Sequence, residues 1–225
     1  MYWIIVTIWP MINFLLNKEY CKSLDNEIST ENKNKIVRNL ISAIHSIGCV
    51  FNLTCVYYTN MDSWRKIAVL YSIGYFIWDS YLIIILDYVS EYPYLIHHFI
   101  SLHTFEYVLF DYYNTEFVSL LILYGELSNF PNYLVYHKIK TNVGKNRNTD
   151  AYLSIKYWKH IQIAWFIFFR VLVYGRYLTT LYLLIDSYLL TIGCYILYGM
   201  GVYWTYGQIK GVYNEYYRKK IVKNE

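Results

Sequence analysis

The sequence predicts an all-α fold: a multi-pass transmembrane bundle of about seven helices, consisting of a six-helix core and an N-terminal span. Three observations predict it, namely a low charged fraction, seven long apolar stretches and an uneven distribution of basic residues. Of the 225 residues, 56% are hydrophobic and 16% are charged, against about 25% charged in soluble domains. The 29 tyrosines fit this class, because their rings suit membrane interfaces. The net charge of +4 is too small to indicate a nucleic-acid partner.

Each predicted helix is an apolar stretch that approaches the length of a bilayer crossing, about 20 residues. The stretches cover residues 2–16, 36–57, 67–86, 94–110, 116–136, 158–174 and 181–206. The first stretch is short and contains Pro10, so we assign it to an N-terminal anchor. The predicted organisation is therefore an anchor and cytoplasmic loop over 1–35, the bundle over 36–213, and a basic cytoplasmic tail over 214–225.

The connecting segments predict an orientation. With seven spans and the N-terminus outside, 16 Lys and Arg residues fall on the cytoplasmic side and 3 on the other. Cytoplasmic segments of membrane proteins carry such an excess of basic residues. The sequence therefore predicts an integral membrane protein with its N-terminus outside and its C-terminus in the cytoplasm.

Polar side chains fall on one face of each of several predicted helices. Because lipid offers no hydrogen-bond partner, such faces are expected to turn toward a shared interior. We therefore expect a polar pocket inside the bundle. Its predicted lining residues are Arg38, His45, Asp79, His97, Glu126, Asn129 and Arg170. The alternative is that these groups only join helices through hydrogen bonds.

Two of these residues suggest specific chemistry. His97 is a candidate general base or nucleophile for acyl transfer, with Asp79 or Glu126 fixing its tautomer. His98 lies about 100° further round the helix, so the two histidines cannot form a ligand pair, and we expect no metal. Arg170 lies near the outer end of the predicted sixth span. It is expected either to extend toward the interface or to pair with an acid or a lipid headgroup.

Several segments together resemble the TLC domain family. They are Gly74-Tyr75-Phe76-Ile77-Trp78-Asp79, Tyr94-Leu95-Ile96-His97-His98 and Gly125-Glu126-Leu127-Ser128-Asn129-Phe130, supported by Tyr203-Trp204 near the end. The resemblance covers roughly residues 36–213. It implies a multi-pass bundle of an endomembrane such as the endoplasmic reticulum, with membrane lipids as partners.

The resemblance also implies two possible functions. In ceramide synthases, paired histidines support N-acylation of a sphingoid base by acyl-CoA, and His97 and His98 match those positions. Ceramide synthases also carry Asp residues one span later, whereas this chain has Glu126-Leu127-Ser128-Asn129. The departure favours the non-synthase branch, so we expect lipid binding, sensing or regulation of membrane lipid composition without a cofactor. The alternative is an acyltransferase that uses His97, His98 and Asp79, with acyl-CoA as co-substrate.

Overall fold

The computed structural model describes residues 2–24, 26, 28–86, 91–110, 114–142, 150–185 and 187–222. These residues contain helices and no strand, which confirms the predicted all-α class. The helices are α1 (Tyr2–Ser23), α2 (Thr30–Thr59), α3 (Asp62–Ile85), α4 (Tyr92–Leu109), α5 (Thr115–Leu127), α6 (Phe130–Thr141), α7 (Asp150–Phe166), the π-helix η2 (Ile167–Val173), α8 (Tyr174–Leu184) and α9 (Tyr188–Val222). Because α9 continues to Val222, the predicted tail from residue 214 is helical up to that residue, and residues 223–225 lie outside the described part of the chain.

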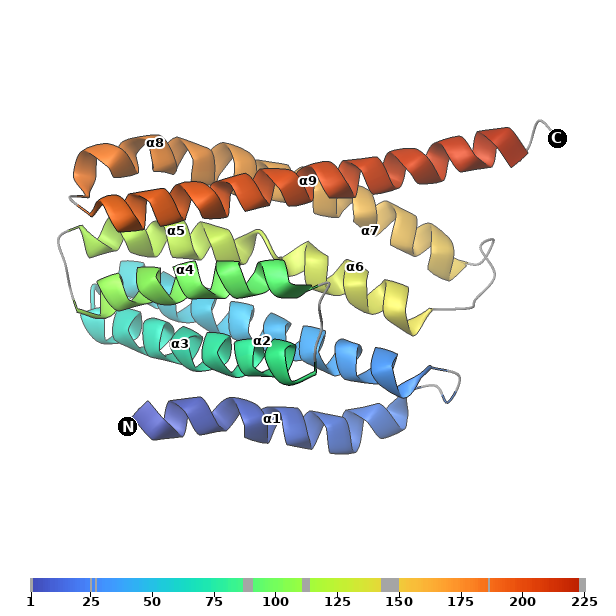
Figure 1. Cartoon of the computed structure of the whole chain (residues 1–225), viewed down its shortest axis with the longest axis horizontal. Coiled ribbons are helices and arrows are strands. Elements are labelled where there is room, and N and C mark those ends of the chain that lie inside the picture. The colour runs from blue at the N-terminus through green and yellow to red at the C-terminus, as the bar shows by residue number, and fades with distance from the viewer. Residues whose placement is uncertain are drawn as a thin grey trace.

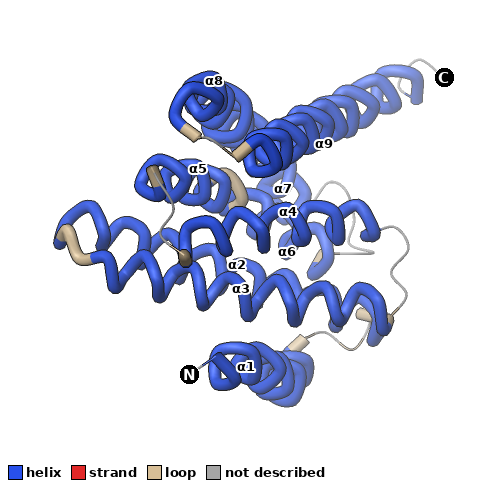
Figure 2. The backbone as a smooth tube through the Cα atoms, turned by 60° about the vertical axis from the view of Figure 1, so that its left-hand side comes forward, coloured by secondary structure: helices blue, strands red, loops and turns tan. Residues whose placement is uncertain are grey.

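The helices lie side by side along one common direction, with the two chain termini at opposite ends (Figure 1). Within the described residues the chain passes along this direction seven times, because α5 and α6 share one passage and α7, η2 and α8 share another. The view in Figure 2 shows α1 at one edge and α8 and α9 at the opposite edge. α2 to α7 lie between these edges.

The N-terminal helix α1 is held against the bundle by a buried tryptophan, together with partly buried apolar residues on either side of it. Trp9 is fully buried, and its indole Nε1 donates a hydrogen bond to the backbone oxygen of Tyr71 on α3 at 3.2 Å. Its ring also packs edge-on against His45 on α2 at 5.9 Å. Because one large side chain contacts both α2 and α3, α1 packs as part of the bundle, even though Pro10 follows directly.

The predicted fifth span, 116–136, is broken in the structure. α5 ends at Leu127 and α6 begins at Phe130, with Pro131 in the first turn of α6. Proline has no N–H for the helical ladder and its ring clashes with the preceding turn, so the helix ends before it. Ser128 donates its hydroxyl to the oxygen of Gly125 at 2.6 Å, which satisfies a carbonyl at the break. The prediction of one continuous span was wrong for this reason.

The boundary between the predicted sixth and seventh spans was also wrong. We expected a span to end at Tyr174 and a loop over 175–180, but the helix continues to Leu184 and α9 starts at Tyr188. Tyr174, Leu178 and Leu181 are all buried at helical spacing. Their shared apolar face holds this segment against the bundle while its polar side chains point outward, which sequence composition alone concealed.

Three of the helical passages are long and apolar enough to cross a membrane: Thr30–Thr59, Asp62–Ile85 and Asp150–Leu184. α5 and α6 have 13 and 12 residues, so neither alone reaches the roughly 20 residues of a crossing. Large apolar side chains cover the outside of the bundle, with Phe99 75% exposed and Leu183 78% exposed. These features are compatible with an integral membrane protein.

Candidate functional site

A cavity of about 850 Å³ lies between α2, α3, α4, α5, α6, α7, η2 and α9. Its walls include every residue that the sequence singled out, because the helices that carry them turn the same faces inward. These residues are Arg38, His45, Asp79, His97, His98, Glu126, Asn129 and Arg170. The structure therefore brings the predicted pocket residues together, and their individual contacts show what each can do.

Arg38 and Asp79 form a two-point ion pair between α2 and α3. Arg38 donates from Nε to Asp79 Oδ1 at 2.5 Å and from Nη2 to Asp79 Oδ2 at 2.8 Å. Its third nitrogen, Nη1, donates to Glu91 at the start of α4. Charge-assisted bonds of this forked kind fix both partners in position. Both oxygens of Asp79 are therefore engaged, which leaves this carboxylate unsuited to act as a general base.

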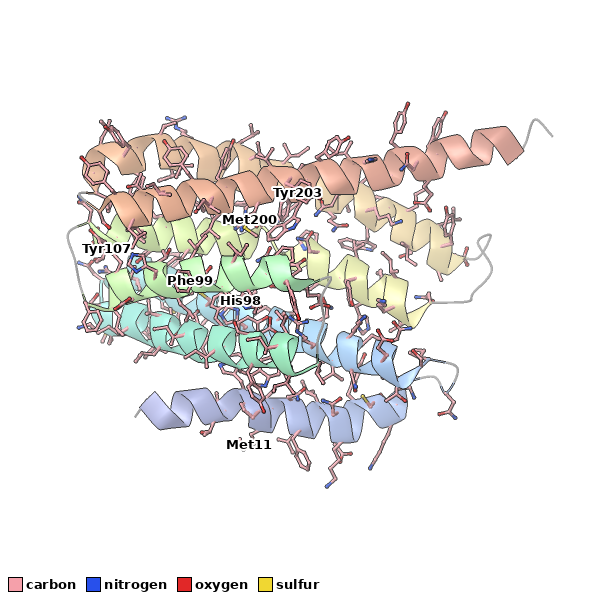
Figure 3. All side chains as sticks on the ribbon, viewed as in Figure 1. Met11, His98, Phe99, Tyr107, Met200 and Tyr203 are labelled. Carbon is pink, nitrogen blue, oxygen red and sulfur yellow. The ribbon has the colours of Figure 1, made fainter. Side chains whose placement is uncertain are left out.

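His98 completes the cluster around Asp79. It is 4% exposed, its Nε2 lies 3.4 Å from Asp79 Oδ2, and its Nδ1 is hydrogen-bonded to Ser80 Oγ at 2.9 Å. In Figure 3 it sits between α4 and the α2–α3 pair, while the neighbouring Phe99 is exposed on α4. We had expected Asp79 to orient His97. The structure assigns that contact to His98 instead.

His97 faces a different part of the cavity. Its ring contacts the rings of Phe76 on α3 at 5.8 Å and Trp204 on α9 at 5.9 Å. Its Nδ1 is buried and has no hydrogen-bond partner among the residues that the structure describes. Of these two adjacent histidines, His97 is thus the one with a ring nitrogen left for a ligand in the cavity, whereas His98 is fixed by its neighbours.

His45 is held by rings on both α1 and α3. It is 1% exposed and stacks on Tyr75 with 4.0 Å between ring centroids and 10° between the planes. Its Nε2 is hydrogen-bonded to Ser72 Oγ at 3.0 Å, and its Nδ1 lies 4.0 Å from Glu126 Oε2. These contacts lock the imidazole, so its role is to shape the wall beside Glu126.

Glu126 and Asn129 occupy the break between α5 and α6. The carbonyl of Glu126 accepts hydrogen bonds from the Ser46 hydroxyl and from the Asn129 backbone N–H, both at 3.0 Å. The side chain of Glu126 is 8% exposed, and its Oε2 lacks a hydrogen-bond partner within the described part of the chain. The break before Pro131 therefore places a carboxyl group in the cavity with one oxygen that has no hydrogen-bond partner among the described residues.

Arg170 lies in the middle of a helical passage, on η2. It is 5% exposed, so the expectation that it extends to the membrane interface was wrong. Because the helix continues to Leu184, Arg170 is far from the helix end. Its guanidinium lies 5.5 Å from the ring of Tyr174, and it makes no ion pair with any described residue. No described acid therefore lies within 4.0 Å of the guanidinium, although Glu126 is near enough to interact with it electrostatically, and the contact with a lipid headgroup stays a prediction.

Other cavity residues were not predicted. Tyr94 stacks on Trp204 at 5.2 Å, and Lys159 pairs with Glu215 at 3.0 Å. Gln162 donates to Asn132 Oδ1 at 2.8 Å. Gln162 and Asn132 were detectable in principle, as polar residues within or beside apolar stretches. The aromatic wall of the cavity, which includes Phe76, Tyr94 and Trp204, could not be predicted, because aromatic residues are spread over most of the chain.

The described residues contain no group of three or more His, Cys, Asp and Glu side chains placed to hold a metal ion. No family model, curated protein or solved structure matches this chain. The site is therefore characterised by its own geometry: a paired ionic cluster at Arg38 and Asp79, an aromatic wall, and unpaired polar atoms on His97, Glu126 and Arg170.

Proposed function

We propose that this chain is an integral membrane protein that binds a membrane lipid within its helix bundle and thereby senses or regulates membrane lipid composition. The cavity of about 850 Å³ carries the proposal, since it joins charged side chains to an aromatic wall. Ligand sites combine apolar walls with a few convergent polar groups in this way. An amphipathic ligand with a polar head and an apolar body suits both parts.

Further features support the membrane setting. Three passages have the length and composition of membrane crossings, and large apolar side chains are exposed around the bundle. The excess of basic residues at one end supports an N-out, C-in orientation. The resemblance to the TLC domain supports an endomembrane such as the endoplasmic reticulum and a role in lipid homeostasis.

The proposal is tested by mass spectrometry of lipids that copurify with the protein in mild detergent. Two glycines offer a matched pair of variants, because a Cβ added at Gly207 or at Gly199 meets no atom within 4 Å. Gly207 lines the cavity and Gly199 does not. We expect Gly207→Phe to obstruct part of the cavity and reduce the retained lipid, while Gly199→Phe keeps it. Equal lipid content in wild type and both variants would overturn the proposal.

An acyltransferase is the second candidate, favoured by the unpaired Nδ1 of His97. In this reaction His97 takes a proton from a lipid amine or alcohol as that group attacks the thioester of acyl-CoA. The new ester or amide forms, the C–S bond breaks, and the thiolate leaves and takes up the proton. Asp79 does not assist directly, because Arg38 occupies both of its oxygens.

Membranes containing the protein are incubated with labelled acyl-CoA to test this candidate. We expect acyl product in wild type and in His103→Ala, and its loss in His97→Ala. His103 is a suitable control because it is on the same helix and pairs with Glu106 at 3.6 Å, away from the cavity. Product formation that is independent of His97, or no product at all, excludes the acyltransferase.

A further inference from the structure

The inner end of the cavity holds three side chains with unsatisfied polar atoms. Arg170 Nε, Glu126 Oε2 and His97 Nδ1 are all buried without a hydrogen-bond partner in the described residues. All three residues line the large cavity and also an adjoining one of about 40 Å³. A buried polar atom without a partner is costly, and a charged one more so. Three such atoms in one place indicate a group that is bound there.

The backbone around Arg170 leaves room only for the arginine. A Cβ added at Gly201 on α9 would lie 2.6 Å from Arg170 Cγ, and one added at Gly125 on α5 would lie 2.9 Å from Nη1. The guanidinium thus lies in a slot between two glycines. Arg170 itself lies on the π-helical segment η2, and π-helical turns are frequent at functional sites. A buried guanidinium whose Nε has no hydrogen-bond partner among the described residues suits an anion, and phosphate matches its fork of donors.

The other two atoms require a donor. Glu126 Oε2 is an acceptor when the carboxyl is ionised, and His97 Nδ1 is an acceptor when the ring proton is on Nε2. A primary ammonium supplies three N–H donors and a positive charge opposite Glu126. A trimethylammonium has the same charge but no N–H donor, so it leaves both acceptors unsatisfied.

We propose that the inner end of the cavity is a headgroup subsite for a zwitterionic phospholipid with a primary ammonium group. The phosphate lies against Arg170, and the ammonium lies against Glu126 and His97. This proposal rests on the lipid-binding function and names the class of lipid that the site selects. The apolar chains of the lipid then lie along the aromatic wall that includes Phe76 and Trp204.

The test compares three lipids with identical acyl chains: phosphatidylethanolamine, phosphatidylcholine and diacylglycerol. Purified protein is incubated with vesicles containing equal parts of the three, re-extracted in mild detergent, and analysed for retained lipid. We expect phosphatidylethanolamine to exceed phosphatidylcholine by about tenfold or more, since a buried charged hydrogen bond is lost with the methylated amine. Diacylglycerol, which lacks the phosphate, is expected to be retained least.

Two variants separate the two halves of the subsite. Glu126→Gln is expected to reduce the preference for the primary amine by about tenfold while phospholipid is still retained. Arg170→Gln is expected to remove the preference for both phospholipids over diacylglycerol. Glu106→Gln and Arg176→Gln are the matched controls, because both residues lie outside the cavity. If Arg170→Gln does not fold, the wild-type preference and Glu126→Gln still decide the outcome.

Several results would overturn the subsite. Equal retention of phosphatidylethanolamine and phosphatidylcholine would do so. A preference for phosphatidylethanolamine that Glu126→Gln leaves unchanged would also overturn it. Either result is expected if water alone satisfies these polar atoms. In both cases lipid is still bound, so the general lipid-binding function stands. In this experiment the lipid-binding function itself fails if none of the three lipids is retained above the level of Gly207→Phe.

Discussion

At the scale of single residues, Arg38 and Asp79 illustrate how a buried ion pair depends on both partners. Asp79 is 3% exposed and accepts two hydrogen bonds from Arg38. Removing one partner of a buried pair leaves an uncompensated charge, which typically costs about 3–5 kcal/mol. We therefore expect Asp79→Asn to destabilise the protein by about that amount, reduced to the extent that Glu91 still holds Arg38.

Thermal unfolding in detergent measures this effect. Glu31→Gln is the control, because Glu31 forms an exposed ion pair with Lys35 at 2.7 Å on the first turns of α2. Exposed pairs on a helix contribute about 0.3–0.5 kcal/mol. An Asp79→Asn variant as stable as Glu31→Gln would show that the pair between α2 and α3 contributes little.

His137, which lies outside the predicted spans, makes the stability of the folded protein depend on pH. Burial, and secondarily the nearby charge of Lys138, lowers the pKa of His137 below its ordinary value. The unfolded chain therefore binds a proton at higher pH than the folded protein does. The contribution of neutral His137 to the stability of the fold is therefore complete above a pH of about 6.5, and it is lost as the pH falls below that value. The neutral ring also contacts the Tyr20 hydroxyl at 3.3 Å, between α6 and α1.

We expect the wild type to lose more thermal stability between about pH 7.5 and pH 5.5 than His137→Gln does. The difference between the two curves isolates His137 from the other histidines. Because His137 is only partly buried, the effect is expected to be modest. Parallel curves for the two proteins would contradict the assignment.

The residues that line the cavity could be predicted from their types and positions in the sequence, whereas the contacts between them could not. Polar side chains in apolar stretches must face an interior, which placed His97, Glu126 and Arg170 on the cavity wall. The choice between His97 and His98 as the partner of Asp79 depends on the rotation and depth of α4 relative to α3. Helix periodicity gives the angle between neighbours on one helix, but it does not give the rotation of one helix against another.

At the scale of elements, the close packing around Arg170 predicts that two glycines of α9 respond differently to substitution by alanine. Gly201 is needed because a methyl group there would lie 2.6 Å from Arg170 Cγ, whereas a methyl at Gly199 meets nothing within 4 Å. We expect Gly199→Ala to stabilise α9 by about 0.5–1 kcal/mol, since alanine favours the helix. Gly201→Ala is expected to lose that gain and to be net destabilising, because the arginine must shift.

Comparing the unfolding temperatures of the two alanine variants isolates the steric effect, since both glycines lie on the same helix. Lipid retention gives a second readout, because a shifted Arg170 no longer occupies the inner end of the cavity. If both variants gain stability equally, the side chain of Arg170 does not occupy the slot between α5 and α9.

Helix boundaries were the least predictable feature of the elements. Pro131 lies just after the break between α5 and α6, but the apolar residues on both sides of it led to the prediction of one continuous span. The segment Gly175–Thr180 looked like a loop because its polar residues interrupt an apolar run. It is helical because Leu178 is buried against the bundle, a tertiary contact that local composition does not reveal.

At the scale of the whole molecule, the antiparallel order of the helices makes the membrane orientation testable. Asn26 and Met61 lie at opposite ends of α2, and both are exposed. α2 is long and apolar enough to cross a membrane. If it does so, a cysteine at one of these positions reacts with a membrane-impermeant maleimide from the cytoplasmic side and the other from the opposite side.

The background for this measurement lacks the four native cysteines, which are all free thiols in the structure. We expect Asn26→Cys to be labelled from the cytoplasmic side, because its end of the bundle carries most of the basic residues and such residues flank cytoplasmic ends. Met61→Cys is expected to be labelled only from the other side. Permeabilised membranes, in which both cysteines should react, are the control for accessibility.

Labelling of both positions from one side in sealed vesicles would mean that α2 does not cross the membrane. The apolar exterior of the bundle would then have to be covered by something other than lipid, because exposed apolar surface of this extent is not left in water.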